Sequence, residues 1–171
     1  VNLFVETSWE SGSLALVSDD QLYSTEWKKR SSHSEVITLK FQELISKVEG
    51  KSSDISRIIL NIGPGSFTGV RVGISFATAL AYVHKLPIIT VNSLEIMAFK
   101  SGFKESLLVA LPAIKGHFYV AGYERIGDKI SEKLVPQSLS QVETMGLKNK
   151  FSQFIDGTQL ETRPTASEIS R

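Results

Sequence analysis

The 171-residue chain contains no cysteine, so it can form neither a disulfide framework nor a thiolate metal site. Histidine is scarce as well, since only His33, His84 and His117 are present, and no two of them fit a His-Glu-x-x-His pattern. A helical zinc site is therefore not encoded locally, and a structural role explains each histidine better than a catalytic one. We expect no metal site and no metalloenzyme.

An excess of charge of one sign is also lacking, because 19 basic side chains stand against 18 acidic ones and the formal net charge is +1. Such a chain has no broad field to steer RNA, so contact with tRNA would require a local patch or a partner. No apolar run reaches membrane-spanning length, and the first residues lack the pattern of a secretory signal. These features predict a cytoplasmic protein without a membrane partner.

The chain has enough apolar residues, 42% of the total, to form the core of one large domain or two small lobes. Short apolar runs and alternating runs predict strands, and apolar residues at helical spacing predict helices. The expected elements of the first half are, in chain order, strands 2–5, 13–18 and 21–28, helix 34–48, strand 58–62, helix 70–84, strand 88–91 and helix 93–100.

The order β-β-β-α-β recurs in the second half, with strands expected at 107–111, 117–123, 130–135 and 151–155. Two helices, one in each half, begin with the capping-box pattern, Ser32-His33-Ser34-Glu35 and Ser140-Gln141-Val142-Glu143. The recurrence predicts an α/β fold of the duplicated, ribonuclease H-like kind, with mixed β-sheets in two lobes. We expect lobes at residues 1–101 and 102–171, the second of them shortened.

Residues 63–73, with the sequence GPGSFTGVRVG, place four glycines between an expected strand and an expected helix. Glycines at such a junction allow close backbone approach, and the free amides of a helix start attract anions. A Walker A loop needs lysine after its last glycine, but Val70 follows Gly69 here, and the Gly-x-Ser-x-Gly elbow is not matched around Ser66. A structural turn, a weak anion site and an interaction element all remain open. Thr68 is expected to cap the helix, and no catalytic residue is identified.

The segment Glu6-Thr7-Ser8 follows the first expected strand and supplies a carboxylate with two hydroxyls. A solvated acid at a strand end is the simpler interpretation, and weak binding of a phosphate is the alternative. The candidate phosphate or nucleotide contacts are Glu6, Thr7, Ser8, Gly63, Gly65 and Ser66.

The helix expected at 70–84 is apolar around most of its circumference. One stripe can pack on the sheet, so the second stripe must be covered by a neighbouring helix or by another protein. The small residues Gly73, Ala77 and Ala81 would permit close helix approach in either case. The candidate partner-binding residues are Val72, Phe76, Ala79 and Val83 on this helix and Ile37, Phe41 and Leu44 on helix 34–48.

Several of these motifs together resemble the bacterial TsaB (YeaZ) family. They are Leu3-Phe4-Val5-Glu6-Thr7-Ser8, Ser32-His33-Ser34-Glu35, the glycine loop 63–73, Val91-Asn92-Ser93-Leu94-Glu95 and Pro164-Thr165-Ala166. The glycine loop is the specific element, and the others alone are weak. The sequence departs from the family at Glu6, where aspartate is usual, and at Pro112-Ala113-Ile114-Lys115, where Asp-Ala-Arg is usual.

The resemblance implies an actin-like or Hsp-chaperone-like ATPase fold and a role in placing threonylcarbamoyl on the adenosine beside the anticodon of tRNA. It implies a non-catalytic scaffold that binds a TsaD-like catalytic paralogue through helices of the first lobe, joins a TsaE-like ATPase, and forms a homodimer when alone. It also implies no cofactor of its own, with nucleotide bound only in the complex and tRNA reached only through it. The rival interpretations are a small-molecule kinase or ATPase that uses Glu6 and the glycine loop, a peptidase, and a homodimer without an enzyme partner.

Overall fold

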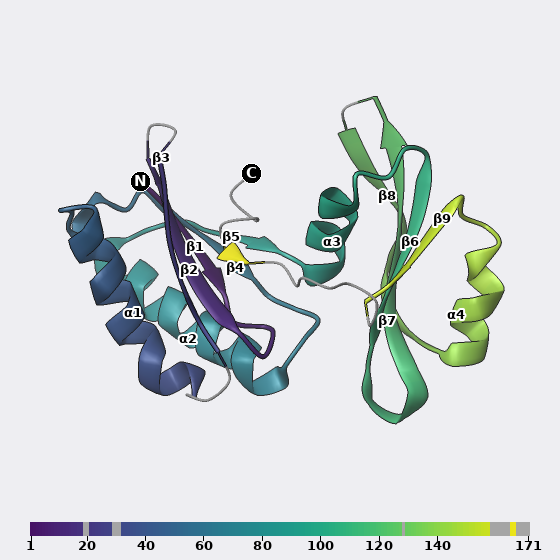
Figure 1. The fold of residues 1–171 in the computed structure, drawn as a ribbon, viewed down its shortest axis with the longest axis horizontal. Coiled ribbons are helices and arrows are strands. Elements are labelled where there is room, and N and C mark those ends of the chain that lie inside the picture. Colours follow the sequence, from purple (N-terminus) through teal and green to yellow (C-terminus); the bar gives the residue numbers. More distant parts are fainter. Residues whose placement is uncertain (19–20, 29–31, 128, 158–164, 167–171) are drawn as a thin grey trace. The chain divides into compact units, whose positions relative to one another are not determined.

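The computed structural model describes residues 1–18, 21–28, 32–127, 129–157 and 165–166, which pack as two compact units (Figure 1). Of the described residues, the first unit holds those within 1–93 together with 165 and 166, and the second holds those within 94–157. The units therefore meet in the sequence at residue 93, whereas the sequence pattern placed the boundary after residue 101. Pro164, part of one motif of the family resemblance, lies outside the described residues.

The first unit is built on a mixed sheet of five strands in the order β3-β2-β1-β4-β5. β1, β2 and β3 form an antiparallel meander; β4 pairs with β1 in parallel, and β5 pairs with β4 in parallel. The strands are β1 (Asn2–Glu6), β2 (Gly12–Ser18), β3 (Gln21–Trp27), β4 (Arg57–Asn61) and β5 (Ile88–Val91). Parallel pairing places the carboxyl ends of β1, β4 and β5 at one edge of the sheet, where ligand sites of open α/β sheets are found.

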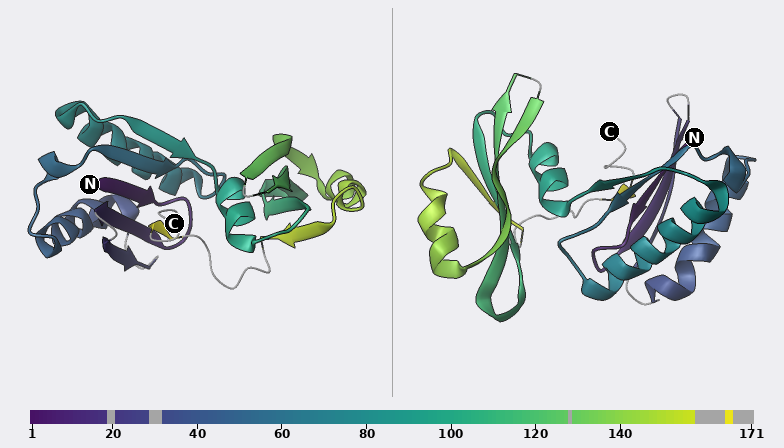
Figure 2. Two further views of the ribbon diagram at one scale, coloured as in Figure 1. Left: turned by 90° about the horizontal axis from the view of Figure 1, so that it is seen from above. Right: turned by 180° about the vertical axis from the view of Figure 1, so that it is seen from behind.

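Helices α1 (His33–Lys47) and α2 (Phe67–His84) lie side by side on one face of this sheet (Figure 2). The short 3₁₀ turn η1 (Ser52–Asp54) leads from α1 to β4. The core beneath the helices contains Leu3, Val5, Leu14, Leu16, Ile37, Phe41, Leu44, Ile58, Leu60 and Ala77. On the opposite face, Phe4, Ala15 and Ile59 pack with Ala166, whose amide donates to the Ser13 hydroxyl at 2.8 Å.

The second unit contains a sheet of four strands in the order β8-β7-β6-β9. Its elements are α3 (Ser93–Ser101), β6 (Ser106–Pro112), η2 (Ile114–Gly116), β7 (His117–Ile126), β8 (Lys129–Ser140), α4 (Gln141–Lys148) and β9 (Gln153–Asp156). α4 packs over Leu108, Ala110 and Val120 of the sheet with its Leu147. The β7–β8 hairpin is longer than the sequence predicted, since β8 runs to Ser140.

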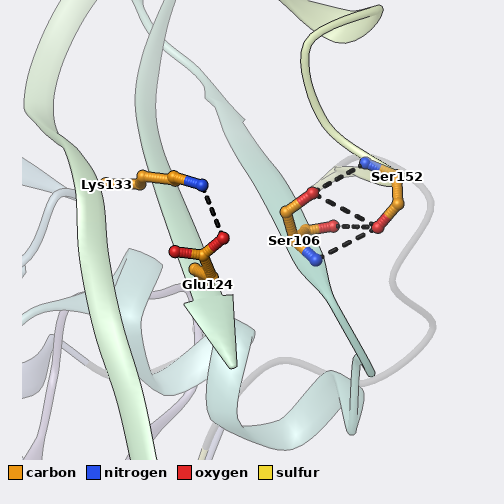
Figure 3. Close-up of polar contacts among 4 residues, drawn as sticks. All are labelled: Ser106, Glu124, Lys133 and Ser152. Carbon is orange, nitrogen blue, oxygen red and sulfur yellow. Dashed lines mark hydrogen bonds and ion pairs between the residues drawn. The ribbon is translucent and has the colours of Figure 1, made fainter. Parts of the chain in front are cut away.

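Two pairs of residues make polar contacts between segments of the second unit (Figure 3). Ser106 at the start of β6 and Ser152 before β9 bond reciprocally, each amide donating to the other hydroxyl at 3.1 and 2.9 Å. Glu124 of β7 and Lys133 of β8 form an ion pair of 2.5 Å. The first pair links β6 to the segment before β9, and the second joins the two strands of the β7–β8 hairpin.

The two sheets repeat one design, because each has an antiparallel meander of three strands with a parallel strand added beside its first strand. In each unit a helix connects the third strand to the fourth. The predicted α/β fold with two mixed sheets of the ribonuclease H-like kind is thereby confirmed. The second sheet has four strands where the first has five, which agrees with a shortened second lobe.

Two of the predicted helix caps are wrong, and one is confirmed. Ser32 precedes α1 but makes no side-chain cap, because its hydroxyl pairs instead with the Ser34 hydroxyl at 2.6 Å. α2 begins at Phe67, earlier than expected, and Ser66 rather than Thr68 is its N-cap. At α4, Ser140 and Glu143 form the complete capping box.

The two serines give a matched test of capping. Ser140→Ala should lower the free energy of unfolding by about 1 kcal/mol, because it leaves the Glu143 amide without its acceptor. Ser32→Ala removes no cap, so its effect should stay within about 0.5 kcal/mol. Urea unfolding followed by far-ultraviolet circular dichroism measures both, and equal losses would contradict the assignment.

Candidate functional site

A buried cluster of four polar residues lies where β1, β4 and β5 end. Glu6 ends β1, Asn61 ends β4, Ser8 follows β1, and Ser93 follows β5 at the start of α3. All four are almost completely buried in the first unit. We call Glu6, Ser8, Asn61 and Ser93 the strand-end cluster.

Glu6 is the only acidic member of the strand-end cluster, and both oxygens of its carboxyl accept hydrogen bonds. One oxygen, Oε1, accepts from the amide and the hydroxyl of Ser8, both at 2.6 Å. The other, Oε2, accepts from the amide nitrogen of Asn61. The expectation of a solvated acid is wrong, because the residue is 1% exposed.

Burial raises the pKa of the Glu6 carboxyl from 4.5 to about 7, because the charged form loses its hydration. The hydrogen bonds from Ser8 and Asn61 act in the opposite direction, since they favour the charged form. Burial outweighs them. Near neutral pH the side chain is therefore present in both protonation states.

Asn61 connects Glu6 to the glycine loop. Its Oδ1 accepts from the amide of Gly63 at 2.9 Å and from the hydroxyl of Ser93 at 3.2 Å, while its Nδ2 donates to Glu6. Asn61 and Ser93 were not among the predicted site residues. The sequence did contain a signal for Asn61, since it is the polar residue within the otherwise apolar run 58–62.

The glycine loop packs directly on the backbone of residues 7 and 8. The Ser66 amide donates to the Ser8 carbonyl at 2.6 Å, and the Thr7 hydroxyl donates to the Gly69 carbonyl at 2.8 Å. A Cβ at Gly65 would overlap the Ser8 carbonyl, and one at Gly69 would overlap the Thr7 carbonyl. The glycines are therefore required for close packing.

The predicted phosphate contacts are thus brought together, but their polar groups bond to each other. Gly63 has φ +89°, a conformation that favours glycine, and its amide is held by Asn61. The Ser66 hydroxyl accepts from the Gly69 amide at 3.2 Å as the cap of α2.

Among the residues that the structure describes, no three histidine, aspartate or glutamate side chains gather as a metal site. No helix in the described part of the chain is long and apolar enough to cross a membrane.

An apolar groove runs between α1 and α2 on the outer side of the first unit. It consists of two adjoining hollows of about 570 and 550 Å³, which share Thr38, Phe76 and Ala79. Phe41 and Phe76 meet edge to face across its floor, with ring centroids 5.4 Å apart. The residues that line it include Ile37, Thr38, Phe41 and Ile45 of α1 and Val72, Phe76, Ala79, Leu80 and Val83 of α2. We call this feature the α1–α2 groove.

Six of the seven predicted partner-binding residues line the groove, and Leu44 does not. Val72, Phe76, Ala79 and Val83 line the groove from α2, and Val83 is 70% exposed. Ile37 and Phe41 also line it but are buried, and Leu44 lies wholly within the core under α1 and does not reach the groove. Leu44 therefore serves intramolecular packing.

His33 has the structural role that the sequence suggested. Its Nδ1 accepts from the Trp27 indole at 2.9 Å, so the other ring nitrogen carries the proton and donates to the Trp9 carbonyl at 2.9 Å. The imidazole thereby joins β3, the start of α1 and the turn after β1.

Comparison with known proteins matches residues 28–167 to the family model described as TsaD: tRNA N6-adenosine threonylcarbamoyltransferase. The protein named "tRNA threonylcarbamoyladenosine biosynthesis protein TsaB" is 28% identical in Buchnera aphidicola, over 92% of this chain and 75% of that protein. The protein of the same name in Escherichia coli is 32% identical over 72% of this chain, which spans about half (54%) of its length. A Streptococcus uberis protein named "tRNA N6-adenosine threonylcarbamoyltransferase" is 29% identical over 95% of this chain and 56% of that protein.

The solved structure with the description "YeaZ from Pseudomonas aeruginosa" has a TM-score of 0.77 at 19% identity, over 99% of this chain and 88% of that one. A second structure from the same organism, of an uncharacterized protein with similarity to peptidase YEAZ, has a TM-score of 0.81 at 19% identity. At this identity the likeness shows the fold alone.

Two helical glycines test the close packing of the loop. Gly69→Ala should lower the free energy of unfolding by about 3 kcal/mol or more, because its methyl group has no room beside the Thr7 carbonyl. Gly146→Ala in α4 meets open space and should stabilise the chain by about 0.5–1 kcal/mol. Urea unfolding measures both. A Gly69→Ala variant as stable as the parent chain would contradict the packing argument.

Proposed function

Because the chain belongs to the family described as TsaD, tRNA N6-adenosine threonylcarbamoyltransferase, and to its TsaB (YeaZ) branch, we propose that it is a non-catalytic subunit in the biosynthesis of threonylcarbamoyladenosine on tRNA. In this proposal it binds a TsaD-like catalytic paralogue through the α1–α2 groove. A TsaE-like ATPase joins the complex, and tRNA is reached only through it. The cytoplasmic location remains a prediction.

The observation that carries the proposal is the open apolar groove. Exposed apolar surface gathered in a concave strip between two helices is typical of a site that receives another helix. Exposed residues on its α2 wall include Ala79 and Val83, which are small or medium-sized, and the polar residues Thr68, Arg71 and Ser75. The groove is therefore suited to a partner that presents helices of its own.

The paralogue is a suitable partner because it shares this chain's family. A TsaD-like protein with the same first-lobe design would present its own pair of helices, and the two pairs would pack as a four-helix arrangement. A second copy of this chain would offer the same surface, which supports a homodimer when the chain is alone. In the resulting scheme the two partners compete for one groove.

The hydrogen bonds made by the polar side chains at the strand ends and in the glycine loop support a non-catalytic role. The Glu6 carboxyl is occupied by three donors, and the Ser66 hydroxyl caps α2. A nucleophile requires an adjacent base and access to a substrate. The Ser66 hydroxyl is engaged as the cap of α2, and the Ser8 hydroxyl, which donates to Glu6 at 2.6 Å, is completely buried.

Adjacent residues on α2 give a matched test of the groove. Val83→Asp places a charge in the groove, whereas Tyr82→Asp places the same charge on an exposed position, 87% accessible, outside the groove lining. The first should weaken binding of the TsaD-like protein of the same organism at least about tenfold, and the second should leave it within about threefold. Calorimetric titration with circular dichroism as the folding control measures both.

Three outcomes would contradict the proposed interface. They are equal affinity of both variants, a greater effect from Tyr82→Asp, and no binding of the parent chain. A homodimer seen by light scattering should be weakened by Val83→Asp in parallel, because it uses the same surface.

One observation favours a second function, that of a small-molecule kinase or ATPase. Acids with a raised pKa at the ends of parallel strands are frequent in active sites, and Glu6 is such an acid. Calorimetry of the isolated chain with ATP and Mg²⁺ separates the two functions. The scaffold predicts no measurable binding, and micromolar binding abolished by Glu6→Gln would favour the enzyme.

A further inference from the structure

The α1–α2 groove carries basic side chains and no acidic one. Among the described residues that line it, Arg71 is the ionisable side chain of the hollow at the first turns of the helices. His84 is the ionisable side chain of the hollow at the last turns, about 20 Å further along α2. Phe76 and Ala79, which line both hollows, lie between the two. The groove therefore offers charge of one sign only to whatever occupies it.

Arg71 has no acidic partner within the described part of the chain. Its guanidinium lies over the exposed ring of Phe67, 5.3 Å from the centroid, and forms no ion pair there. α2 contains no acidic residue along its whole length. Glu35 and Glu43 of α1 lie outside the groove lining, and Glu43 already pairs with Lys40 at 2.7 Å. No described carboxylate of this chain therefore occupies the fork of donors that Arg71 presents.

A helix that covered the groove would take Arg71 out of water. The residue is exposed in the isolated chain, and it lines its hollow beside the hydroxyls of Thr68 and Ser75. Removing a cation from water is costly unless an opposite charge replaces the hydration, and a carboxylate can accept two parallel hydrogen bonds from a guanidinium. The occupant that fits the groove is therefore an apolar helical surface with an aspartate or glutamate opposite Arg71.

A second copy of this chain does not offer that carboxylate from its own groove. A symmetric dimer uses the same surface twice, so each groove would bring a further arginine and no acid. The apolar surface of the groove can be covered by either partner. A partner with an acid at the right place therefore has an advantage that the copy lacks.

We propose that Arg71 is a specificity-determining residue of the α1–α2 groove, which selects a partner helix whose carboxylate pairs with its guanidinium. The inference rests on the proposed function, in which that partner is the TsaD-like protein. It adds the contact that gives this protein preference over a second copy of the chain. Apolar contact supplies the buried area, and the ion pair decides which partner is bound.

A charge series at Arg71 tests the pair. Arg71→Gln removes the charge, and Arg71→Glu reverses it with a side chain of almost the same size. Affinity for the TsaD-like protein should fall about tenfold in the first and at least about a hundredfold in the second, whereas Arg71→Lys should bind more tightly than Arg71→Gln. Arg57→Gln, at an exposed position of β4 outside the groove lining, should stay within about threefold of the parent chain. Calorimetric titration measures the affinities, and circular dichroism is the folding control.

Salt and self-association separate an ion pair from a loss of packing. Raising sodium chloride from about 50 mM to about 500 mM should weaken binding of the TsaD-like protein more in the parent chain than in Arg71→Gln, because only the parent has a pair to screen. The homodimer followed by light scattering should stay within about threefold in Arg71→Gln, because it contains no carboxylate opposite the arginine.

The possible failures can be told apart. Equal affinity of the parent chain, Arg71→Gln and Arg71→Glu for the TsaD-like protein would overturn the inference and leave the proposed function in place. Equal weakening of the homodimer and the heterodimer would show that Arg71 does not select the partner. Loss of tRNA binding in Arg71→Glu, with unchanged affinity for the protein, would assign the arginine to a nucleic acid instead. Absence of binding by the parent chain would contradict the proposed function and the inference together.

Discussion

The close packing of the glycine loop on residues 7 and 8 is the contact on which the first unit depends. Without side chains at Gly65 and Gly69, the loop reaches the Ser8 and Thr7 carbonyls, and the Ser66 amide bonds to Ser8. This approach determines where α2 begins and how close it lies to the sheet. α1 then packs beside it over the same sheet, and the space between the two helices becomes the groove.

The same packing explains why the polar side chains at the carboxyl ends of β1 and β4 are buried. The carboxyl ends of β1 and β4 meet as parallel pairing requires, but their polar residues bond to one another. Accessible apolar surface lies between α1 and α2. A protein built in this way is suited to act by binding.

Local patterns predicted much of this fold because their causes are local. Strand alternation and helical spacing gave both β-β-β-α-β units, and the glycines indicated close backbone approach. The burial of Glu6 was not predicted, because it depends on Asn61, which is 55 residues away in the sequence. The two capping-box patterns also behave differently, since the Ser32 hydroxyl has a nearer partner in Ser34. Helical spacing predicted both Leu44 and Phe76 as partner-binding residues. Three-dimensional packing places Leu44 in the core and Phe76 in the groove, a difference that the spacing cannot show.

Hydrogen–deuterium exchange of this chain with and without the TsaD-like protein tests the central claim most directly. Binding in the groove predicts slower exchange in the helical segments that line it, residues 34–46 of α1 and 68–84 of α2, with little change in β7 and β8. Protection confined to the second unit, with α1 and α2 unchanged, would contradict the account.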